Sequence, residues 1–143
     1  MFMGEYHHNL DSKGRVVMPS KFREKLQNEF VIARGIEKCL YVYTLEDWNK
    51  LVQKLNTLSF TKKDTRIFIR AFFSGATTCE TDMQGRATIP SSLISYASIN
   101  KEITIIGASD HIEIWDKDMF DTFLMENEDN LSNIAENLFG GDL

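Results

Sequence analysis

Two short segments of the chain carry the same chemically capable pattern. Residues 11–15 read Asp-Ser-Lys-Gly-Arg and residues 82–86 read Asp-Met-Gln-Gly-Arg. A guanidinium is a rigid fork of donors that matches guanine O6 and N7, or a phosphate, by two-point contact. The aspartate four residues earlier is placed to hold that fork, and Lys13 on the exposed part of the first turn suits a phosphate. The pattern points to nucleic-acid recognition.

A plainer interpretation of each segment is a surface ion pair. An exposed Asp–Arg pair across a turn contributes less than about 1 kcal/mol to stability and is often functionally silent. The repetition favours a function, because the glycine and a following proline, Pro19 or Pro90, keep their places in both segments.

The whole chain repeats itself, which explains the two segments. At a shift of 71 residues six identities align: Gly4 with Gly75, Asp11 with Asp82, Gly14 with Gly85, Arg15 with Arg86, Pro19 with Pro90 and Ser20 with Ser91. A shift of 72 then aligns Gly35 with Gly107, Tyr43 with Trp115 and Trp48 with Phe120, as one inserted loop residue would produce. Two copies of one small unit are therefore predicted.

Each copy is predicted to fold as strand, turn, strand, short helix, two strands and a closing helix. Gly at the fourth turn position supplies the positive φ of a tight hairpin, and the proline ends the following strand. Residues 30–33 and 40–43, like 103–106 and 112–115, predict hairpins, and Thr44 and Asp116 predict helix N-caps. Residues 61–73 predict a linker helix, and the tail shows weak helical periodicity.

The charge is unevenly distributed along the chain. The net charge is −5, yet from Asp110 onward the sequence has ten acidic residues and one basic residue, Lys117. The preceding part has an excess of basic residues, with a local cluster made of Lys13, Arg15, Lys21, Arg23 and Lys25. The second copy is poor in basic residues, so the first turn is expected to dominate binding to a polyanion.

Other features narrow the class of protein. No apolar stretch reaches the roughly 20 residues of a membrane-spanning helix, and the first residues do not form a signal peptide, so a cytoplasmic location is expected. Cys39 and Cys79 are then expected to be free thiols.

Two other classes of function compete with nucleic-acid binding: a protein-interaction hub and an enzyme. A protein-interaction hub without DNA binding would use the acidic end and the apolar tail residues. An enzyme is disfavoured, because His7 and His8 point to opposite faces of an extended segment and no nucleophile elbow, phosphate loop or zinc spacing occurs.

The chain resembles the MraZ family of bacterial transcriptional regulators. The likeness runs from Met-Phe-Met-Gly through Asp-Ser-Lys-Gly-Arg, Leu-Tyr-Val-Tyr and Glu-Asp-Trp, and on through Lys-Lys-Asp-Thr-Arg, Phe-Phe-Ser-Gly-Ala, Asp-Met-Gln-Gly-Arg and Glu-Ile-Trp, up to about residue 125. It implies an α+β, β-rich fold: tandem AbrB-like swapped-hairpin repeats in an intramolecular pseudo-dimeric barrel with flanking helices. The expected units are repeat 1 at 1–58, a linker helix at 59–73, repeat 2 at 74–126 and a C-terminal tail at 127–143.

The resemblance also implies a function and a set of site residues. It implies a nucleoid-associated homo-oligomeric ring that binds repeated promoter boxes in double-stranded DNA of the division and cell wall gene cluster, usually as a repressor. No cofactor, metal, membrane or small-molecule substrate is expected. The DNA-binding residues expected from the motif and the basic cluster are Lys13, Gly14, Arg15, Gln84, Gly85, Arg86, Lys21 and Arg23, with Asp11 and Asp82 orienting the turns.

Overall fold

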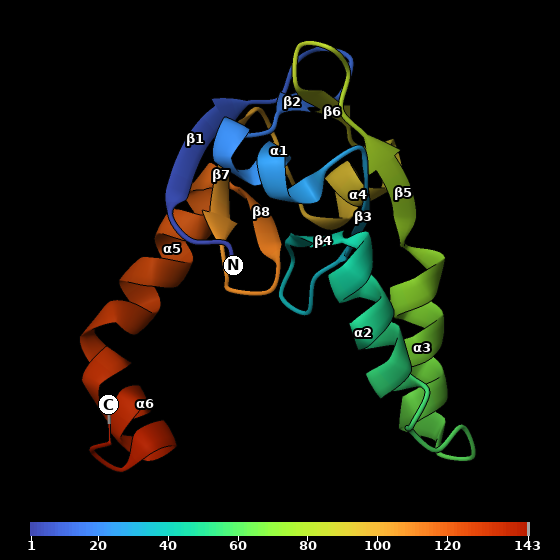
Figure 1. The fold of residues 1–143 in the computed structure, drawn as a ribbon. Coiled ribbons are helices and arrows are strands. Elements are labelled where there is room, and N and C mark those ends of the chain that lie inside the picture. Colours follow the sequence, from blue (N-terminus) through green and yellow to red (C-terminus); the bar gives the residue numbers. More distant parts are fainter. Residues whose placement is uncertain (143) are drawn as a thin grey trace.

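The computed structural model describes residues 1–142, so only Leu143, the last residue of the tail, lies outside the description. The elements follow one another as β1 (Glu5–Asn9), β2 (Arg15–Val17), α1 (Ser20–Leu26), β3 (Glu29–Arg34), β4 (Leu40–Thr44), α2 (Leu45–Leu55), α3 (Lys63–Ser74), β5 (Thr77–Glu80), β6 (Arg86–Thr88), α4 (Ser91–Tyr96), β7 (Glu102–Gly107), β8 (Ile112–Asp116), α5 (Lys117–Asn127), a 3₁₀ turn (Glu128–Asn130) and α6 (Leu131–Phe139) (Figure 1). The order repeats, as the internal alignment predicts. None of the helices in residues 1–142 combines the length and apolar character needed to cross a membrane.

The two halves of the chain exchange strands. The main sheet has the order β1-β7-β8-β4-β3-β5, so the first strand of each half pairs with the third strand of the other half. The predicted hairpins β3–β4 and β7–β8 are present, and β4 pairs with β8 at the centre of the sheet. Neither half has a complete sheet by itself, because each borrows an edge strand from the other.

The ladders form a six-stranded sheet and a separate ribbon. The hydrogen-bonded pairs within residues 1–142 place β1 and β5 at the two ends of the sheet, and the barrel implied by the resemblance stays a prediction. The second strands of the two halves, β2 and β6, form an antiparallel two-stranded ribbon that lies at one end of the molecule (Figure 1). The fold is therefore an α+β arrangement of two repeated halves.

The turn segments 11–14 and 82–85 are tight turns whose flanking strands pair across the two halves. Gly14 and Gly85 do adopt positive φ angles of 74° and 77°, as predicted. Each turn is closed by a backbone hydrogen bond of 2.9 Å, from the Asp11 N–H to the Arg15 carbonyl and from the Asp82 N–H to the Arg86 carbonyl, so the tight turns are confirmed. Beyond the turns the flanking strands pair with the other half, β1 with β7 and β2 with β6. This pairing buries Val16 and Ala87, which are 1% and 0% exposed.

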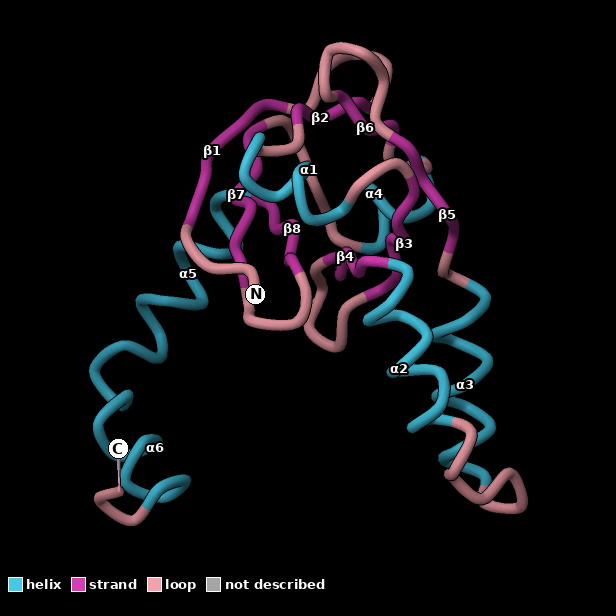
Figure 2. Tube along the Cα trace, viewed as in Figure 1, coloured by secondary structure: helices cyan, strands magenta, loops and turns pink. Residues whose placement is uncertain are grey.

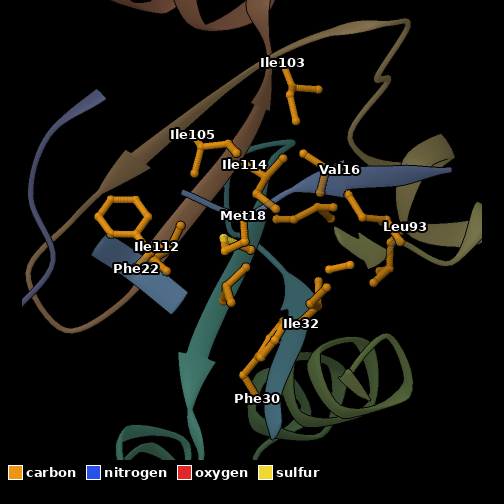
Figure 3. Packing of buried hydrophobic residues seen from close by; sticks show 14 of the residues in the cluster. Val16, Met18, Phe22, Phe30, Ile32, Leu93, Ile103, Ile105, Ile112 and Ile114 are labelled. Atoms are coloured by element: carbon orange, nitrogen blue, oxygen red, sulfur yellow. The ribbon is translucent and has the colours of Figure 1, made fainter. Parts of the chain in front are cut away.

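The main core lies between the sheet, the ribbon and the two short helices. Figure 3 shows Val16 and Met18 meeting Ile103, Ile114 and Leu93, so residues of both halves share one apolar interior. At about 25 cal/mol per Å² of buried apolar surface, this shared core is a main source of stability, and it ties the halves together.

The longer helices extend away from the ribbon (Figure 2). Thr44 caps α2 by accepting a hydrogen bond from the Asp47 backbone N–H, and Asp116 caps α5 in the same way through Met119, as predicted. The linker helix α3 packs against α2, where Trp48 and Phe72 stack with centroids 5.5 Å apart. The tail forms the 3₁₀ turn and α6.

Candidate nucleic-acid interface

The first turn is organised around the carboxylate of Asp11. Its Oδ1 atom accepts hydrogen bonds from the backbone N–H groups of Lys13 and Arg15, at 2.9 and 2.8 Å. Its Oδ2 atom accepts a hydrogen bond from Nε of Arg15 at 2.7 Å. One carboxylate thus fixes both the backbone of the turn and the direction of the guanidinium.

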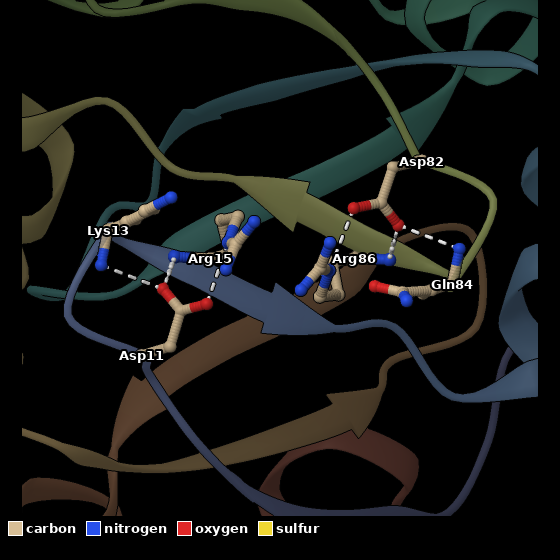
Figure 4. Close-up of polar contacts among 6 residues, drawn as sticks. All are labelled: Asp11, Lys13, Arg15, Asp82, Gln84 and Arg86. Carbon is tan, nitrogen blue, oxygen red and sulfur yellow. Dashed lines mark hydrogen bonds and ion pairs between the residues drawn. The ribbon is translucent and has the colours of Figure 1, made fainter.

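The second turn repeats this arrangement. Asp82 Oδ1 accepts from the backbone N–H groups of Gln84 and Arg86, both at 2.9 Å, and Oδ2 accepts from Nε of Arg86 at 2.8 Å (Figure 4). In both turns the pair uses Nε of the arginine. No hydrogen bond from the Nη atoms of either arginine is found within residues 1–142, so the outer edge of each fork stays available.

The two carboxylates are held in their ionised form. Hydrogen bonds from the backbone and the side chain of Arg15 lower the pKa of Asp11 below its usual value, and Arg86 lowers the pKa of Asp82 in the same way. Each ion pair is therefore fully formed near neutral pH, where the arginine is also charged.

Both arginines lie on one face of the molecule, as the repeated turns predict. The ribbon pairs Arg15 with Thr88, Val16 with Ala87 and Val17 with Arg86. This register has a local two-fold at its centre and sets the two guanidinium groups close together on the outward face (Figure 4). Their side chains are 26% and 30% exposed, so neither is buried.

Each turn rests on the other half of the chain. The Met18 N–H donates to the Gly85 carbonyl at 2.9 Å, and the Ile89 N–H donates to the Gly14 carbonyl at 2.8 Å. A Cβ atom at Gly85 would overlap the guanidinium of Arg23 on α1. The first half therefore supplies a cation to the second turn, a location that sequence reasoning did not predict.

The counterpart of Arg23 is apolar. Ile94 on α4 occupies the matching place beside Gly14 of the first turn. The two turns were expected to differ in positive charge. Because Arg23 of α1 lies beside the second turn, which has few basic residues of its own, this difference is smaller than expected. Arg23 lies beside Gly85 because the two halves exchange strands, and no sequence pattern near Arg23 predicts this contact.

The remaining predicted cations are less closely grouped. Lys13 is exposed at the first turn, and its counterpart Gln84 is exposed at the second. Lys21 is exposed on α1 and makes no hydrogen bond or ion pair with either turn in the described part of the chain. Lys25 of the basic cluster contacts the Met1 carbonyl and the Phe2 ring instead.

Sequence reasoning missed two residues of the outward face. Val17 is 40% exposed and Thr88 is also exposed, and they lie across the ribbon from Arg86 and Arg15. Residues 15–17 read Arg-Val-Val, so the sequence does not indicate which valine faces outward. The alternation of buried and exposed positions appears only when β2 and β6 pair.

Groups suited to other chemistry are not gathered into a comparable site. Cys39 and Cys79 are free, as predicted, and Cys39 is buried. Residues 1–142 contain no cluster of three or more metal-ligating side chains. His111 lies between Asp110 and Glu113, with hydrogen bonds of 2.7 and 2.8 Å, and stacks on Tyr43. These contacts form a network of charged groups and aromatic rings on the main sheet, away from the β2–β6 ribbon.

The chain matches a protein-family model in two segments. The model described as "MraZ protein, putative antitoxin-like" matches residues 1–71 and, a second time, residues 72–142. The two matches correspond to the two halves that exchange strands, and together they cover nearly the whole chain.

Proposed function

The chain belongs to the MraZ family, which is not an enzyme family, with one MraZ domain in each half; from this premise we propose that it is a sequence-specific DNA-binding transcriptional regulator. We propose further that it acts as a repressor at repeated promoter boxes of the division and cell wall gene cluster, and that it works in the cytoplasm at the nucleoid. Its residues for DNA are Arg15 and Arg86, aided by Lys13, Gly14, Gln84, Gly85, Lys21 and Arg23.

The paired arginine forks on the β2–β6 ribbon are the observation that carries this proposal. The major groove of B-DNA, about 12 Å wide, admits a two-stranded β-ribbon, and arginine with two donors is the commonest reader of guanine. Asp11 and Asp82 hold the forks before DNA arrives, which reduces the side-chain entropy lost on binding.

The distribution of charge supports the same orientation. The ribbon lies at one end of the molecule, whereas the acidic helices α5 and α6 lie at the other (Figure 1). Exposed charges separated by more than about 8–10 Å are largely screened at physiological salt. The acidic end therefore opposes DNA binding at the ribbon much less than the net charge of −5 implies.

We also propose that several copies act together as a ring. One protomer neutralises few phosphates, and affinity rises with the number neutralised, so tight binding needs several protomers on successive boxes. Once one protomer of the ring has bound a box, binding of the next protomer to the next box is intramolecular. This raises the overall affinity by about a hundredfold when the spacing of the boxes matches that of the protomers.

A groove of about 410 Å³ beside α5 supports self-assembly. Its lining combines apolar residues with an excess of acidic over basic ones: Trp115, Met119, Phe123, Glu37, Asp118, Glu126 and Lys38. In the first half the corresponding face of α2 is covered by the phenylalanines of α3. Ile67 and Phe68 of α3 are exposed among basic residues. Helix α3 of one copy therefore complements the apolar and acidic groove beside α5 of a neighbouring copy.

The test is a gel-shift titration on the DNA upstream of the gene itself, with footprinting on the same fragment. The proposal expects protected, regularly spaced boxes and retention that weakens steeply with salt. The Arg15→Ala variant should lose the protection. A protein-interaction hub would show no salt-sensitive retention on DNA, and that result would refute the proposed function.

A further inference from the structure

Four side chains make up the outward face of the ribbon. Side chains alternate along a strand, so Arg15 and Val17 share one face of β2 while the buried Val16 points to the core. Residues that pair across strands also share a face, and the register pairs Arg15 with Thr88 and Val17 with Arg86. The arginines therefore act beside two further exposed residues.

The face is symmetric except at these two positions. The local two-fold that relates the arginines also relates Val17 to Thr88. Valine is apolar, with no group that donates or accepts a hydrogen bond. The Thr88 hydroxyl has no hydrogen bond within residues 1–142. Both side chains are exposed and nearly equal in size, so the two halves of the face differ mainly in chemistry.

This inference rests on the DNA-binding function proposed above. We propose that Val17 and Thr88 are specificity-determining residues, which make the two halves of the ribbon select different base pairs beside the two arginine contacts. In a major groove, an apolar side chain favours the 5-methyl group of thymine; threonine keeps one methyl for that contact, but its hydroxyl also bonds to donors and acceptors on other bases, so it selects thymine less strongly than valine. Val17 selects thymine next to the base read by Arg86. Thr88 accepts several bases next to the one read by Arg15.

The preferred site is therefore asymmetric within one chain. Contacts to phosphate position a protein without reading sequence, so the exposed Lys13 adds affinity at one end without fixing a base. The cross-strand neighbours of the arginines are the ribbon side chains close enough to the base edges to break the symmetry of two equal forks. A single substitution at either position should make the two halves alike.

The experiment selects binding sites from a pool of random-sequence DNA duplexes. It compares the wild-type protein with Val17→Thr and Thr88→Val, which preserve side-chain size on an exposed strand. Val17→Thr should weaken the thymine preference in one half-site, and Thr88→Val should strengthen it in the other. Thr78→Val makes the same chemical change on β5, away from the ribbon, and should select the wild-type site.

A second measurement isolates the methyl group. Replacing the selected thymine by deoxyuridine removes one methyl and leaves the hydrogen-bonding edge intact. It should weaken wild-type binding about fourfold and weaken the binding of Val17→Thr by a smaller factor. If the wild type and both variants select one identical site, the inference is overturned while the proposed function stands. If the wild type enriches no sequence, both fail.

Discussion

Arg23 lies directly over Gly85, although the two residues belong to different halves of the chain. Its counterpart in the second half, Ile94, lies over Gly14. The relationship arises because each turn is followed by a strand that pairs with the other half. The second turn thus depends on the first half both for backbone hydrogen bonds and for a neighbouring cation.

Substitution of the turn glycines tests this relationship. Gly14→Ala should destabilise the protein by about 1–2 kcal/mol, since an alanine is strained at φ 74°. Gly85→Ala should carry the same strain and a small excess, because its methyl group also displaces the flexible end of Arg23. In chemical denaturation, Arg23→Ala should remove that excess; simple additivity of the two changes would contradict the contact.

Removal of one guanidinium tests the reading face. Arg15→Ala should weaken binding to a promoter box by about 1–3 kcal/mol per site and lower the salt dependence by about one counterion, while the protein stays folded. Arg15→Lys keeps the charge and loses the planar fork. In the gel-shift titration, Arg15→Lys should show the salt dependence of the wild type but not its preference for the promoter box. Wild-type selectivity in this variant would argue against two-point contact by the guanidinium.

Removal of the turn carboxylate should act indirectly. Asp11→Ala loses the acceptor for two backbone N–H groups and for Arg15 Nε, so the melting temperature should fall and DNA affinity should drop less than in Arg15→Ala. The pKa of Asp11 is lowered in the fold, so its stabilisation is present above the ordinary pKa and is lost as pH falls through the lowered value. The melting difference should therefore be present at pH 7 and shrink at about pH 3. A difference that does not change with pH would exclude the ion pair as its cause.

His111 should give stability the opposite dependence on pH. Burial alone lowers the pKa of His111, but hydrogen bonds and charges from Glu113 and Asp110 outweigh it and raise the pKa. Folding then favours the protonated ring, and this stabilisation is complete below the ordinary pKa of about 6.5 and lost as pH rises through the raised value.

The matching variant is His111→Gln, which keeps polarity without the charge. The melting temperature of the wild type should exceed that of the variant by about 2–4 °C more at pH 5.5 than at pH 8.5. Tyr41 and Tyr43, which contact the ring, carry no charge over that range because burial raises the pKa of each phenol. An equal difference at both pH values would show that the ring acts only by packing.

The groove beside α5 should control assembly. Met119→Glu places a charge among apolar groove residues, so native mass spectrometry should show fewer subunits. Met125→Glu makes the same change on the same helix, outside the groove and at a residue that is 74% exposed. That control should assemble normally, and equal disruption by both variants would indicate an unspecific effect of added charge.

The sequence by itself determined the local units of this protein. The aligned turns, the positive φ of Gly14 and Gly85, the caps at Thr44 and Asp116 and the hairpins β3–β4 and β7–β8 all follow from residue type and spacing. These features depend on contacts between residues a few positions apart, for which the sequence pattern holds enough information.

Only the tertiary structure decided which half completes which. The sequence does not identify the strands that bury Val16 and Ala87, because each of these strands belongs to the other half of the chain. Pairing of β2 with β6 brings Val16 and Ala87 into the core that both halves share. The common direction of Arg15 and Arg86, the exposed pair Val17 and Thr88, and the place of Arg23 are consequences of that long-range pairing.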